Sequence, residues 1–183
     1  ADGSTEDSPQ NGDILNATDS VITEADGSGD ILFADDSEVL IHPETHITLD
    51  TISAFDETGM IDTSFRLRGG RVENTVNPAR EKNSRFRVIT PPAIAAVKGT
   101  GFSVAYLLDK NTTMAEVDTG LVGMQAGGVE VDVPAGFGSV TEFGKTPGAP
   151  RARLAAPDLS QLSDRIDASQ IEFEWIGLAG AQS

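Results

Sequence analysis

Short apolar runs separated by turn-forming residues are the feature that most limits what this chain can fold into. Runs such as Ile31-Leu32-Phe33 and Val39-Leu40-Ile41 alternate with clusters of Asp, Gly and Ser from residue 13 to residue 145. Runs of three to five residues are typical of β-strands, because a stable helix needs a longer periodic segment. The sequence therefore predicts an all-β fold.

Glycines stand before several of these runs in a recurring way. Gly70, Gly120 and Gly136 each lie at a turn that opens a new strand. A repeated unit of turn and strand is typical of stacked architectures. We therefore expect a solenoid-like stack of short strands, of the β-helix or β-roll type, with a β-sandwich as the alternative.

Residues 86–104 form the centre of this pattern, with the sequence FRVITPPAIAAVKGTGFSV. Pro91-Pro92 forbids a central strand at that point, because proline has no amide hydrogen to donate to a neighbouring strand. Alternation on either side places Phe86 and Phe102 on the core face of their strands.

Composition divides the chain into four segments. Residues 1–12 are a polar N-terminal segment, and residues 13–145 form the β domain. Residues 146–170 are predicted to be a Pro-rich linker with one short helix. Residues 171–183 are predicted to be a C-terminal strand segment.

Charge is distributed unevenly along the 183 residues, whose net charge is −16. The first 65 residues contain sixteen acidic side chains and no Lys or Arg, whereas residues 66–98 contain eight basic side chains against two acidic ones. The two blocks can pair within one molecule, which we favour, or between molecules. Strong overall acidity makes nucleic acid and anionic membranes unfavourable partners.

Neither cysteine chemistry nor a membrane span is available to this sequence. The chain contains no Cys, which excludes disulfides, thiolate nucleophiles and Cys-based metal sites. No run approaches the roughly 20 apolar residues of a spanning helix. The Ala1-Asp2 start, without a leader pattern, is expected of a mature exported protein or of a trimmed chain.

Candidate metal sites are weak. His42 and His46 flank Pro43 and Glu44, and this proline spoils the helical spacing that would bring two histidines together. The Asp clusters at 26–30, 35–38 and 56–57 match no calcium-loop pattern and are better explained as turns. We expect no metal site and no cofactor.

Catalytic motifs are equally weak. The glycine-rich stretch at 136–146 has the wrong spacing for a phosphate loop, and no G-x-S-x-G motif occurs. Paired carboxylates acting on a polysaccharide stay open, but one Trp and one Tyr offer few aromatic platforms for sugars. We expect a protein that is not an enzyme.

Two sets of residues are candidates for contact with a partner. The first is a basic stripe across adjacent strands that would bind an anionic partner, or else form a solvated face: Arg66, Arg68, Arg71, Arg85 and Arg87. The second is the alternating strand of Ile171, Phe173 and Trp175, which has no following strand to pair with. Such a strand could add to the sheet edge of another molecule.

Several motifs together resemble the FecR domain family. The most specific is ITPPAIAAVKGTGFSV at 89–104, similar to the family's V-[KR]-G-T-x-F-x-V pattern. Residues 31–39, 67–72, 117–122 and 133–136 resemble its other landmarks in order, so that the likeness covers about residues 12–145. Asp36 stands where the family usually has Gly, and Asp tolerates the left-handed backbone of such a turn better than most residues.

The resemblance implies an extracytoplasmic, non-catalytic, β-rich domain with a solenoid-like core. The iron-signalling role of the full FecR protein is not carried over, because it requires a membrane span and a helical cytoplasmic region. The likeness is closer to exported members that accompany other cell-envelope modules.

These observations favour a bacterial protein, extracellular or periplasmic, that acts by binding or assembly. The first interpretation is self-assembly through strand addition into a fibre or other homopolymer. The alternative is a periplasmic sensing or scaffold module that binds another envelope protein or peptidoglycan.

Overall fold

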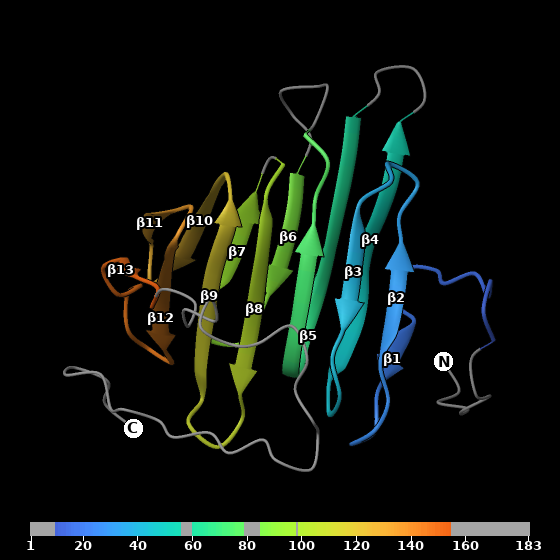
Figure 1. Ribbon diagram of the computed structural model, residues 1–183, viewed down its shortest axis with the longest axis horizontal. Coiled ribbons are helices and arrows are strands. Elements are labelled where there is room, and N and C mark those ends of the chain that lie inside the picture. Colours follow the sequence, from blue (N-terminus) through green and yellow to red (C-terminus); the bar gives the residue numbers. More distant parts are fainter. Residues whose placement is uncertain (1–9, 56–59, 79–84, 98, 155–183) are drawn as a thin grey trace, which may run out of the picture. The chain divides into compact units, whose positions relative to one another are not determined.

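A computed structural model describes residues 10–55, 60–78, 85–97 and 99–154. Thirteen strands make up the regular structure of this part of the chain, and it contains no helix (Figure 1). The all-β prediction is confirmed. The strands are β1 (Ser20–Ile22), β2 (Gly29–Leu32), β3 (Glu38–Ile41), β4 (His46–Phe55), β5 (Met60–Thr75), β6 (Arg85–Ile89), β7 (Ile94–Val97), β8 (Gly101–Leu107), β9 (Thr112–Thr119), β10 (Leu121–Ala126), β11 (Val129–Pro134), β12 (Phe137–Glu142) and β13 (Arg151–Ala152).

The strands form two facing layers that share β5. Layer A contains β1, β4, the first part of β5, β6, β7, β10 and β11. Layer B contains β2, β3, the second part of β5, β8, β9, β12 and β13. Figure 1 shows layer B in front of layer A.

Strand pairing does not confirm the expected solenoid-like stack. Stacked coils of a β-helix pair in parallel, whereas β5 and β6 form the only parallel ladder among the described strands. The described strands form one thirteen-stranded sheet that is continuous through β5, so the sandwich alternative is not confirmed either. The chain instead alternates between the layers, with the β6–β7 hairpin in layer A, β8–β9 in layer B and β10–β11 in layer A.

Glycines with positive φ stand at four of the places where the chain passes from one layer to the other. Gly70 (φ 90°) lies within β5, Gly99 (φ 101°) between β7 and β8, Gly120 (φ 81°) between β9 and β10, and Gly136 (φ 82°) between β11 and β12. The recurring glycines seen in the sequence are therefore corners. At Gly70 the corner is also crowded, because a Cβ would lie 2.5 Å from Thr45 Cα and 2.6 Å from the Glu44 carbonyl oxygen.

The core lies between the layers and is built mainly from Val, Ile, Leu and Phe. Phe86, on β6 of layer A, has edge-to-face contacts with three other rings, at centroid distances of 5.9 Å to Phe33, 6.0 Å to Phe65 and 6.5 Å to Phe102. Phe102 is on layer B, so this aromatic group joins the layers. Such pairs contribute about 0.5–1.5 kcal/mol each beyond the area that they bury. The predicted core positions of Phe86 and Phe102 are confirmed.

Local turn geometry agrees with two details of the sequence. Asp36 adopts φ 61°, the left-handed conformation that the family's usual glycine would supply. Its neighbour Asp35 accepts hydrogen bonds from the Ser37 amide (3.1 Å) and hydroxyl (2.8 Å), which closes the β2–β3 turn. The break at Pro91-Pro92 lies between the end of β6 and the start of β7.

The sheet edges differ in how they are protected. The segment after β12 returns along it: the Gly148 amide donates to the Val140 carbonyl (2.9 Å), and β13 then pairs with the start of β12. Among the described strands, β11 pairs only with β10, and its free edge carries Glu130, Asp132 and Pro134. Charges and proline at an edge disfavour further strand pairing. In layer B, the edge opposite β13 is formed by β2, and the one charged residue in this strand is Asp30.

Replacing Gly70 with Ala is expected to destabilise the fold strongly. The left-handed conformation alone costs an L-residue about 1–2 kcal/mol, and the contact with Thr45 adds the cost of shifting a packed backbone. Gly136→Ala is the matched control, because Gly136 has a similar φ but open space where the added Cβ would lie. Urea unfolding should show a clearly larger loss for Gly70→Ala. Equal losses would mean that crowding at this corner is unimportant.

Candidate partner-binding groove

A row of four residues crosses the outer face of layer A and forms the centre of the candidate site. Strand register places Arg87 of β6 beside Ala96 of β7, Ala96 beside Gly123 of β10, and Gly123 beside Asp132 of β11. Side chains alternate along each strand, so these residues face outward while neighbours such as Val88 and Val122 face the core. The register therefore sets a cation and an anion at opposite ends of a row of small residues.

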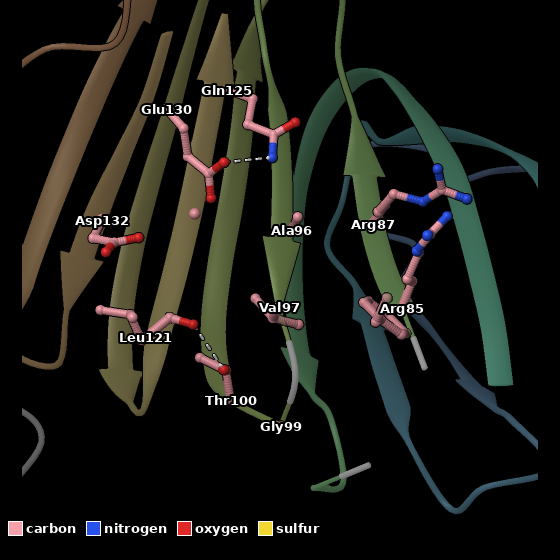
Figure 2. Close-up of a pocket in the computed structure, with 12 residues that line it drawn as sticks. Arg85, Arg87, Ala96, Val97, Gly99, Thr100, Leu121, Gln125, Glu130 and Asp132 are labelled. Carbon is pink, nitrogen blue, oxygen red and sulfur yellow. Dashed lines mark hydrogen bonds between the residues drawn. The ribbon is translucent and has the colours of Figure 1, made fainter. Parts of the chain in front are cut away.

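The small residues leave a groove of about 570 Å³ on this face. Ala96 and Gly123 form its floor, and Leu121 and Thr100 lie at one end, where the Thr100 hydroxyl donates to the Leu121 carbonyl at 3.1 Å. Figure 2 shows the arginines on one side of the groove, and Glu130 and Asp132 on the other. Glycine within a strand is typical of places where another backbone approaches closely.

The basic wall is formed by Arg85 and Arg87 on β6. Arg87 Nη2 lies 2.8 Å from Asp62 Oδ1 on the neighbouring strand β5, which fixes the direction of this guanidinium. Arg85 is exposed, and its guanidinium points along the same wall (Figure 2). One arginine is thus held in place, and the other is open to a ligand.

The acidic wall is formed by Glu130 and Asp132 on β11. Gln125 Nε2 donates to Glu130 Oε2 at 3.1 Å, which holds this carboxylate over the groove. Among the described residues no ion pair joins the two walls. Because Asp62 neutralises Arg87, the charges that face a molecule between the walls are those of Arg85 on one side and of Glu130 and Asp132 on the other.

The other candidates from the sequence lie elsewhere. Arg66 is paired with Asp50 (2.8 Å), and Arg68 donates from Nε to the Thr48 hydroxyl (3.0 Å), both on the outer face of layer A. Arg71 lies past the Gly70 corner, on the outer face of layer B. The five arginines are therefore divided between two faces. Ile171, Phe173 and Trp175 lie outside the described residues.

Sequence reasoning found the basic wall and missed the rest of the groove. The alternation of Glu130 and Asp132 in β11 is visible in the sequence, and so are the small residues Ala96 and Gly123. No local signal says that these strands are neighbours. Only the pairing of β7 with β10, strands that are separated in sequence by the β8–β9 hairpin, assembles the site.

Metal-binding clusters are not found in the part of the chain that the structure describes. No group of three His, Asp or Glu side chains there is arranged to hold a metal ion. His42 Nε2 lies 3.0 Å from Glu73 Oε1 on layer B, whereas His46 is on β4 of layer A. Within the same residues, no helix is long and apolar enough to cross a membrane.

Comparison with known proteins gives one family and one set of structural relatives. The sequence model of a family described as FecR protein matches residues 19–123. Among curated proteins, none matches the chain. Two crystal structures of a protein assigned as an anti-sigma factor of Parabacteroides distasonis ATCC 8503, at 2.50 and 1.65 Å resolution, share the fold with a TM-score of 0.61 and 14% identity. The alignment covers 73% of this chain and 59% of that protein, less than two thirds of its length.

The titration of His46 offers a check on the packing of β4. Burial, and then the charge of Arg68, lower the pKa of His46 below its ordinary value of 6.5. The unfolded chain therefore binds this proton more readily than the folded one, and the contribution of neutral His46 to stability is lost as pH falls below about 6.5. NMR titration should give a His46 midpoint below 6.5, and Arg68→Gln should raise it. A midpoint at or above 6.5 would contradict the described surroundings.

Proposed function

Because the chain belongs to the FecR family, we propose that it is a non-catalytic sensing or regulatory module that binds a protein partner outside the cytoplasm. The observation that carries this proposal is the groove on layer A, with its basic wall, acidic wall and small-residue floor. The anti-sigma factor assignment of the structural relative supports a regulatory role. The family resemblance supports an extracellular or periplasmic location.

The groove suits an extended segment of a partner protein. Its walls stand on β6 and β11, three strand spacings apart, which is about 14 Å between backbones. A segment lying over Ala96 and Gly123 can place a carboxylate near Arg85 and a cation or amide near Glu130 and Asp132. Exposed ion pairs of this kind contribute little affinity individually, but complementary charges fix orientation and exclude wrong partners.

Two alternatives have less support. Peptidoglycan or another envelope polymer would be expected to use aromatic platforms, and among the described residues that line the groove the one aromatic ring, Phe86, is buried in the core. Hydrolysis would need a pair of catalytic carboxylates around a bound sugar. Glu130 accepts a hydrogen bond from Gln125, and both Glu130 and Asp132 lie on an open face, which favours binding over chemistry.

Gly123→Val tests the groove directly. A valine fills the floor and fits a strand, and the nearest atom to its Cβ is Glu130 Oε1 at 2.7 Å, the end of a flexible side chain that can move. The fold should therefore persist while partner binding falls roughly tenfold. Gly29→Val is the matched control, since Gly29 is also in a strand, has open space and lies on layer B.

The measurement compares the three proteins as immobilised baits in an envelope extract, with thermal unfolding recorded for each. Partners should be retained by the wild type and by Gly29→Val and lost from Gly123→Val. If all three baits retain the same proteins, binding does not use this groove. Retention of purified peptidoglycan by the wild type alone would favour the polymer alternative.

Self-assembly through strand addition is a more specific form of the proposal, in which the protein partner is a second copy of the chain. It rests on the sequence of residues 171–175. The feature that bears on it is the free edge of β2 among the described strands. Replacing Phe173 and Trp175 with Ser should reduce self-association in sedimentation velocity at high protein concentration in salt. A wild-type protein that stays monomeric under these conditions would rule the idea out.

A further inference from the structure

The outer face of layer B carries a second groove, of about 580 Å³, which differs from the first in the chemistry of its lining. Its floor is apolar and consists of Ala105, Leu107, Leu108 and Met114 from the β8–β9 hairpin. Leu108 is 68% exposed and Met114 36% exposed, and Val140, the register partner of Met114 on β12, is 46% exposed. Met114 and Val140 are thus neighbours on the sheet face and Leu108 belongs to the adjoining turn, and exposed apolar side chains that gather in this way are typical of a contact surface.

The central charge of this groove is already neutralised. Arg71 Nη2 lies 3.4 Å from Glu73 Oε1 and 3.9 Å from Glu116 Oε2, and it donates to the Ser103 hydroxyl at 3.2 Å. Arg71 is the only cation among the described residues that line the groove, whereas Glu44, Asp109 and Glu116 are the anions. Because Arg71 is shared between two glutamates, the groove presents a net negative rim to a ligand.

Both free carboxylates of the rim stand on turns with a fixed backbone. Glu44 adopts φ 53°, and the hydroxyl of the next residue, Thr45, accepts from the Arg71 amide at 3.0 Å. Asp109 belongs to the β8–β9 turn, in which Asn111 adopts φ 46° and accepts a 2.9 Å hydrogen bond from the Tyr106 hydroxyl. The backbone positions from which these two exposed carboxylates project are therefore defined by the fold.

We propose that this groove on layer B binds a protein segment in which a lysine or arginine is adjacent to an aliphatic side chain. The aliphatic group covers Leu108 and Met114, and the cation lies between Glu44 and Asp109. The layer A groove takes a ligand of mixed charge, so the two faces select different ligands and one copy of the domain can bridge two partners. This second surface does not depend on the first.

A labelled Lys-Leu-Lys-Leu-Lys peptide is the probe, read by fluorescence anisotropy in about 0.1 M salt, where surface charges act over roughly 10 Å. Binding should weaken roughly fivefold when Glu44→Gln and Asp109→Asn are combined. The matched control combines Glu130→Gln and Asp132→Asn, which removes the same two charges from the other face and should change binding less than about twofold. A Lys-Ser-Lys-Ser-Lys peptide should bind the wild-type protein more weakly than the leucine peptide does. The leucine peptide should also bind Met114→Ser more weakly than it binds the wild type.

Three results would overturn the proposal. Equal weakening by the two double variants would mean that the peptide responds only to the overall acidity of the protein. Equal affinity for the serine and leucine peptides would mean that the apolar floor is not used. Loss of peptide binding in Gly123→Val would mean that the peptide binds the layer A groove and would overturn the layer B proposal. The proposed function of the layer A groove would not be contradicted by that result.

Discussion

Moving the chain repeatedly between two facing layers is the constraint on which the rest of the structure depends. At four of these crossings, in β5 and before β8, β10 and β12, a glycine with positive φ provides the corner within one or two residues. Because the corners are short, successive hairpins stay close enough to share a core, and the ring of Phe86 contacts Phe65 of layer A and Phe102 of layer B. The two outer faces, and with them the two grooves, are consequences of the same alternation.

Local structure could be predicted from the sequence to a large extent, because it depends on neighbouring residues. The apolar runs at 31–33 and 39–41 predicted β2 and β3, and Pro91-Pro92 predicted the break between β6 and β7. The positions of the turn glycines were predicted, but the architecture that they serve was not. A corner between two layers and a corner of a stacked coil have the same local sequence.

The candidate groove could be predicted only in part, because it depends on register between distant strands. Arg85 and Arg87 were identified by charge and alternation, whereas Gly123 and Asp132 became part of the site only through ladders to β7 and β10. The uneven charge of the chain has a simple structural counterpart. Arg66 and Arg87 from the basic block pair with Asp50 and Asp62 from the acidic block, which is the intramolecular arrangement that the composition favoured.

Glu130 and Asp132 serve two purposes at once, and this limits how freely β11 can vary. Their side chains form a wall of the groove, while their position on the last strand of layer A helps to prevent a foreign strand from adding to its edge. A change that adjusts ligand preference at this wall therefore also alters resistance to aggregation. Adaptation to a new partner is less constrained on β6, where the surrounding strands cover both sides of the backbone.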